Sequence, residues 1–261
     1  MEWDECARRG AIGAIGAVPG TMLAHPADLV KIRQQCTGAS LADSMRSISA
    51  AGLYRGVGAG IAQKFATRGP MFLAAEASTQ LVEAATGMSR ECAVWIGSFC
   101  SGYVTGLFAA PAEWAKVQQG MATARTVSLR HSILGAGARH RLHGAGLRNA
   151  LFDSTFFATE HAAATHGAPP ALSFGGAAAL AVVVDFPLDA TVKRSMAAPP
   201  GASVRPPLVA MWALLREHRF GVFLGLGAKA AEFATSYAVT GQCSPYISSW
   251  LAGAKPPPKS R

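Results

Sequence analysis

The chain has 261 residues, of which half are hydrophobic and only 15% are charged, and its mean hydropathy is +0.23. This composition argues against a soluble domain of average polarity, although an alanine- and glycine-rich soluble helical protein remains an alternative. The formal net charge of +9 favours an anionic partner. Because the basic residues form no arm interleaved with aromatics, we predict no nucleic acid. The five cysteines contain no CxxC pair, so no metal site or disulfide framework is predicted.

The first predicted element is a membrane helix over residues 10–25, whose glycines and alanines allow close helix packing. It leads into PADLVK at 26–31, where Pro26 predicts a kink. Asp28 and Lys31 are three positions apart and therefore share one helix face. The segment 41–52 reads as a short amphipathic surface helix. A second membrane helix is predicted within 50–76, after the aromatic-basic-glycine turn Tyr54, Arg55 and Gly56.

The same order of features follows in the middle of the chain. The apolar segment 95–110 ends in PAEWAK, which places Pro111, Glu113 and Lys116 as the first copy places its proline, acid and base. The segment 141–160 repeats the second membrane helix with a shorter interval between its glycine and its acid. The middle of the chain therefore predicts another pair of membrane helices.

A third copy begins with the apolar segment 173–186 and continues as PLDATVK. Pro187 and Asp189 occupy the positions of the earlier prolines and acids. Val192 stands where the base is expected, and Lys193 lies about 100° further round the helix. A surface helix over 208–220 and a membrane helix within 216–241 complete the copy.

Three copies in one register predict the fold class: an all-α membrane protein with six transmembrane helices in three pseudo-threefold repeats and short surface helices. We expect one carrier domain over 1–261. Its predicted parts are repeats at about 7–86, 89–166 and 171–250, with a polar tail at 251–261.

The three proline motifs and the turns LYRG, LHG and FLG resemble the mitochondrial carrier family over residues 7–250. The resemblance implies a multi-pass protein of the mitochondrial inner membrane. It also implies a matrix-side gate of ion pairs below a central cavity, with a glutamine brace at Gln35. The implied pairs join neighbouring repeats: Asp28 with Lys116, Glu113 with Lys193, and Asp189 with Lys31.

The opposite gate departs from the family pattern, in which each even-numbered helix carries an acid followed three residues later by a base. Glu76 and Glu160 keep the acid, but Thr79 and Ala163 replace the bases. The third copy has Thr240 and Cys243 at these positions. We therefore expect this end to close by packing and not by ion pairs.

The resemblance also implies one substrate contact on each even-numbered helix. The matching positions are Gln63, Leu147 with Arg148, and Glu232. Arg148 and Glu232 could pair across the cavity, and one base with one acid would suit a zwitterion. The alternative is that these two residues neutralise each other in a cavity that does not transport. The intact turn Tyr54-Arg55-Gly56 is the implied cardiolipin site.

Two functions remain open from the sequence. The first is a solute carrier for a small anionic or zwitterionic metabolite, working by alternating access. The second is a transport-inactive subunit of a large inner-membrane complex, such as a respiratory-chain or ATP-synthase assembly. No catalytic motif or metal signature appears, so we predict no enzyme activity and no cofactor besides bound cardiolipin.

Overall fold

The computed structural model describes residues 3–37, 40–46, 54, 57–120, 137–198, 204–218, 223 and 225–253. Within these residues the chain is helical and contains no strand. Each of six helices has at least 26 residues: α1 (Trp3–Thr37), α3 (Val57–Thr86), α4 (Arg90–Gly120), α6 (Ala138–Thr165), α7 (Pro170–Ala197) and α9 (Leu226–Leu251). Two are shorter: α2 (Leu41–Arg46) and α8 (Pro207–His218). α2 lies within the predicted segment 41–52, and α8 overlaps the predicted segment 208–220 but begins one residue earlier.

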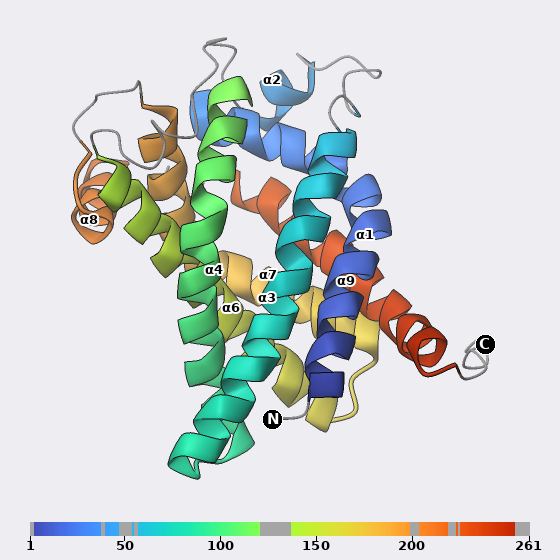
Figure 1. Cartoon of the computed structure of the whole chain (residues 1–261). Coiled ribbons are helices and arrows are strands. Elements are labelled where there is room, and N and C mark those ends of the chain that lie inside the picture. The colour runs from blue at the N-terminus through green and yellow to red at the C-terminus, as the bar shows by residue number, and fades with distance from the viewer. Residues whose placement is uncertain are drawn as a thin grey trace.

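The six long helices close into a ring. In ring order, α1 packs against α3, then come α4, α6, α7 and α9, and α9 returns to α1. Figure 1 shows these helices side by side, with α2 at the upper end of the bundle and α8 at its side. Three consecutive helix pairs thus form one bundle, in agreement with the order of predicted elements.

Glycines allow the helices of the ring to approach closely. A Cβ atom added at Gly20 of α1 would lie 2.4 Å from the backbone oxygen of Ser236 in α9. At Gly97 of α4, the added atom would lie 2.6 Å from the backbone nitrogen of Thr79 in α3. Real Cβ atoms do not approach backbone this closely, so these crossings need glycine. The small-residue composition therefore determines how tightly the ring can close.

The three motif prolines all lie inside long helices, with Pro26 in α1, Pro111 in α4 and Pro187 in α7. α1 also contains Pro19. Figure 1 shows α1 changing direction along its length, its later part running across the upper end of the bundle. Proline removes a backbone hydrogen bond and is a common cause of such a bend.

Two of the long helices are apolar enough, by length and composition, to cross a membrane. They are α4 over Arg90–Pro111, with a mean hydropathy of 1.4, and α7 over Pro170–Ala197, with 1.8. The other four long helices do not reach this mean hydropathy. The prediction of a helical membrane protein is thus supported at α4 and α7.

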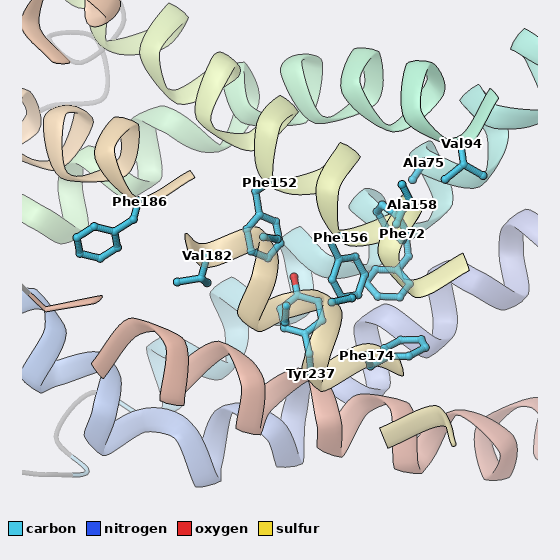
Figure 2. Packing of buried hydrophobic residues seen from close by; sticks show 14 of the residues in the cluster. Phe72, Ala75, Val94, Phe152, Phe156, Ala158, Phe174, Val182, Phe186 and Tyr237 are labelled. Atoms are coloured by element: carbon cyan, nitrogen blue, oxygen red, sulfur yellow. The ribbon is translucent and has the colours of Figure 1, made fainter. Parts of the chain in front are cut away.

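Aromatic side chains fill the interior of the ring at one level (Figure 2). The ring centroid of Phe156 in α6 lies 4.6 Å from Tyr237 in α9 and 5.9 Å from Phe72 in α3. Because α3, α6 and α9 are not neighbours in the ring, their side chains can meet only in its interior. We call the following buried residues the aromatic cluster: Phe72, Phe152, Phe156, Phe157, Phe174 and Tyr237.

Candidate functional site

A cavity of about 430 Å³ lies inside the ring of helices. All six long helices contribute to its wall, among them through Asp28, Arg68, Glu113, Arg148, Asp189 and Lys229. Its volume lies within the range of small-molecule sites, and its wall combines charged and aromatic side chains. A small polar solute therefore has both the space and the chemical groups to bind here.

Ion pairs of the proline motifs form the charged side of this cavity. Lys31 Nζ lies 2.7 Å from Asp28 Oδ1 on the same helix. Lys193 of α7 contacts Glu113 of α4, which joins two helices. Asp189 Oδ2 lies 3.1 Å from Lys229 Nζ. These side chains are buried or nearly so. A buried charge is costly without an opposite charge beside it, so each of these groups needs its ion-pair partner to remain charged.

Two further charged residues belong to the same network. Arg148 Nη1 on α6 lies 2.7 Å from Glu113 Oε1 and 3.3 Å from Asp189 Oδ1. Glu232 Oε2 on α9 lies 2.6 Å from Lys31 Nζ. We call the motif residues together with Arg148, Lys229 and Glu232 the proline-motif layer. Its contacts connect α1, α4, α6, α7 and α9, so separating these helices must break ion pairs.

A second set of ion pairs lies toward the start of α1. Arg90 Nη2 on α4 lies 2.7 Å from Glu76 Oε1 on α3. Arg9 Nη1 on α1 lies 3.5 Å from Glu160 Oε1 on α6, and Arg9 Nε lies 4.0 Å from Glu76 Oε2. We call these four residues the arginine layer. They connect four helices that belong to the first two repeats.

The aromatic cluster separates the cavity from the arginine layer. Phe152 and Tyr237 line the cavity. Phe72 and Phe157 line a much smaller pocket, together with the residues of the arginine layer. The order along the ring axis is therefore the proline-motif layer, the cavity, the aromatic cluster and the arginine layer.

The segment that contains the first predicted repeat matches a known family. Residues 2–85 match the family model described as mitochondrial carrier protein. The match covers 84 of the 261 residues, so the chain is similar to this family over its first repeat. No curated protein matches it. Members of this family are membrane transporters of mitochondria.

The contacts in the structure agree with one of the implied gate pairs and differ at another. Glu113 and Lys193 are in contact, because the long lysine stem reaches Glu113 although Val192 holds the expected position. Val192 itself is buried in an apolar cluster with Trp114. Lys31 does not form an ion pair with Asp189; its partners are Asp28 and Glu232.

The implied substrate contacts also lie differently than expected. Arg148 and Glu232 do not pair with each other across the cavity, since each binds a residue of the proline motifs. Leu147 packs against an apolar cluster beside the ring interior. Of the positions expected to touch substrate, Arg148 and Glu232 are thus part of the proline-motif layer.

The expectation that the opposite end lacks ion pairs is wrong. Glu76 pairs with Arg90 and Glu160 pairs with Arg9. Both arginines lie on the first helix of a repeat and not on the helix that carries the glutamate. A fixed acid-to-base spacing along one helix cannot detect partners on another helix. Arginines near the starts of α1 and α4 were the available signal. Thr240 donates a hydrogen bond to the backbone oxygen of Gly16 instead of joining an ion pair.

Several predicted residues lie outside the described part of the structure. They are the side chains of Gln35, Gln63 and Lys116, and the whole of Arg55 and Gly56. Tyr54 is described and is 52% exposed, with its ring centroid 6.3 Å from that of His25. The brace and the lipid site therefore stay predictions.

Proposed function

We propose that this protein is a solute carrier of the mitochondrial inner membrane that moves a small anionic or zwitterionic metabolite by alternating access. In this proposal the six long helices all cross the membrane. The observation that carries it is the cavity, whose wall is shared by all six helices and which lies between the proline-motif layer and the arginine layer.

The energetics of the two layers suit alternating access. Buried ion pairs recover in mutual attraction roughly what their charges lose in hydration. A layer built from such pairs can therefore separate when water or solute replaces the partners, within a few kcal/mol. The proline-motif layer would open on the matrix side, and the arginine layer with the aromatic cluster would open on the other side.

Uptake by the purified protein in liposomes tests this proposal. Saturable uptake of at least one metabolite from a broad panel is expected for the wild-type chain. Lys31→Ala should abolish uptake, because it leaves Asp28 and Glu232 without the ammonium group that both contact. Arg216→Gln, at an exposed position of α8, should retain uptake. Background uptake by the wild type across the panel would contradict the proposal.

One observation favours the second candidate, a transport-inactive subunit of a large inner-membrane complex. Arg148 and Glu232, at the implied substrate contacts, have their charges satisfied within the protein. Stoichiometric co-purification with a respiratory or ATP-synthase complex, together with background uptake, would support this candidate. Protein that runs alone and gives saturable uptake would exclude it.

Cardiolipin at the first turn remains part of the proposal. Tyr54 is exposed and lies just before α3 begins at Val57, where helix N-terminal amides favour phosphate. Lipid extraction from the purified protein followed by mass spectrometry should recover cardiolipin. Arg55→Gln should lower the recovered amount.

A further inference from the structure

We infer that the cavity binds a neutral zwitterion of the amino-acid type, with its carboxylate at Arg68 and its ammonium group at Asp153. This inference rests on the proposed function, and it names the class of solute that the carrier would move. It comes from the two charged side chains of the cavity wall that the described ion pairs do not use.

The charged residues of the cavity wall are otherwise satisfied. Asp28 with Lys31, Glu113 with Lys193 and Asp185 with Lys229 are examples of pairs along this wall. Among the charged side chains that line the cavity in the described part of the chain, only Arg68 and Asp153 form no ion pair. One base and one acid are therefore left for a solute.

Asp153 has no hydrogen-bond donor among the described residues, although its exposed fraction is only 3%. Its Oδ2 lies against the backbone of α4, 2.9 Å from where a Cβ at Gly102 would stand. Arg148 and Asp185 act on it electrostatically with opposite signs. A buried carboxylate without a partner is costly, and a ligand ammonium group would remove that cost.

Arg68 is also 3% exposed and is held in place by an aromatic ring. Its guanidinium carbon lies 3.9 Å from the ring centroid of Tyr237. Nη1 makes one long hydrogen bond of 3.4 Å to Thr240, and Nη2 is buried without a hydrogen-bond partner. A guanidinium that stacks on a ring keeps its N–H groups at the edge, where they match a carboxylate.

The two residues lie at the same level of the ring. Arg68 precedes Phe72 on α3 by about one helical turn, and Asp153 precedes Phe156 on α6 by about the same interval. Phe72 and Phe156 are in ring contact at 5.9 Å. Because Arg68 and Asp153 both line the cavity beside this contact, a solute placed there can reach both charged groups.

The surroundings favour a solute without a further charge. Met71, Phe152, Phe233 and Tyr237 line the cavity near these two residues and offer apolar surface to a side chain. An additional charge on the solute would need a partner that is already used in the proline-motif layer. A neutral amino acid satisfies all of these conditions, whereas a dicarboxylate would leave Asp153 facing a like charge.

Thermal unfolding of the full-length detergent-solubilised protein measures binding. The probes are L-leucine, L-phenylalanine and the other neutral L-amino acids, each matched with its decarboxylated amine and its deaminated acid; succinate serves as the dicarboxylate. At least one neutral amino acid should raise the unfolding temperature, and both of its single-charge analogues should bind at least about thirtyfold more weakly, as expected for loss of a buried charge pair. Tighter binding of succinate would overturn the inference.

Variants link the effect to the two residues. Arg68→Gln and Asp153→Asn should each weaken binding of the amino acid by about thirtyfold or more, while Arg216→Gln and Asp4→Asn, at exposed positions, should bind like the wild type. Without ligand, Asp153→Asn should unfold at the wild-type temperature or above it, because it removes an unpaired buried charge. Unchanged amino-acid affinity in Asp153→Asn would show that Asp153 is merely a protonated side chain and would overturn the inference.

An uptake assay distinguishes failure of this inference from failure of the proposed function. Saturable uptake of a dicarboxylate or nucleotide that no amino acid inhibits would overturn the inference and leave the carrier proposal standing. Background uptake of the whole panel would overturn both. Uptake of a neutral amino acid that is lost in Arg68→Gln supports both.

Discussion

Neutralising Arg9 and Arg90 should open the end of the ring that the arginine layer closes. Arg90 contacts Glu76 at 2.7 Å, and Arg9 lies 3.5 Å from Glu160. The Arg90 side chain is 39% exposed and that of Arg9 is 24% exposed, so solvent screens both contacts. Each arginine therefore contributes about 0.5–1 kcal/mol. The variant with Arg9→Gln and Arg90→Gln should shift the opening equilibrium by about 1–2 kcal/mol, or roughly five- to thirtyfold.

Cys6 offers a built-in reporter for this opening. It is a free cysteine, fully buried at 0% exposure, and it lies on α1 less than one turn before Arg9. With the other cysteines replaced by serine, the rate at which a polar maleimide labels Cys6 measures how often this end is open. The double variant should label Cys6 roughly five- to thirtyfold faster than the parent.

Arg8→Gln is the matched control for the Cys6 experiment. Arg8 neighbours Arg9 in sequence, but its ion-pair partner is Glu5 on the same helix. Its labelling rate should stay within about twofold of the parent. Equal rates in the parent and the double variant would refute the conclusion that ion pairs hold this end closed.

Three further substitutions test the packing and the charge network by the stability or recovery of the protein. The first readout is the unfolding temperature. Glu113→Gln should lower it more than Lys193→Gln, because Glu113 forms ion pairs with two cations, whereas Lys193 forms one ion pair among the described residues; the reverse order would contradict the network. Phe156→Ala should cost about 3–5 kcal/mol by opening a cavity in the aromatic cluster, and a loss below about 1 kcal/mol would show that the cluster is loosely packed. Gly20→Leu should prevent α1 and α9 from meeting, so recovery of stable protein should fall sharply, while normal recovery would contradict the close crossing.

Local patterns in the sequence were sufficient to predict the helices of the ring. Glycine-rich apolar segments, each ending in a proline motif, predict the positions of α1, α4 and α7, and the short surface helices follow from amphipathic segments. Hydropathy alone detects only α4 and α7 as candidate membrane helices among the described residues. Repetition was therefore a stronger signal than hydropathy.

The partners of charged residues were harder to predict than the helices. The contact between Glu113 and Lys193 follows from the repeat, but Arg9 pairs across helices and has no spacing relation to Glu160. Asp153 gave no signal at all, because its importance comes from being buried without a partner. The pairing of Arg9 and the burial of Asp153 both depend on how helices distant in sequence pack together in the assembled ring.

The aromatic cluster has a consequence for the electrical properties of the membrane. An ion crossing the ring would have to shed its water between Phe72, Phe156 and Tyr237, whose rings are packed without exposure to solvent. Moving a charge through such an apolar layer is strongly unfavourable. In the form described here, the protein would act as an insulator, so a membrane that contains many copies would keep its voltage and proton gradient between transport events.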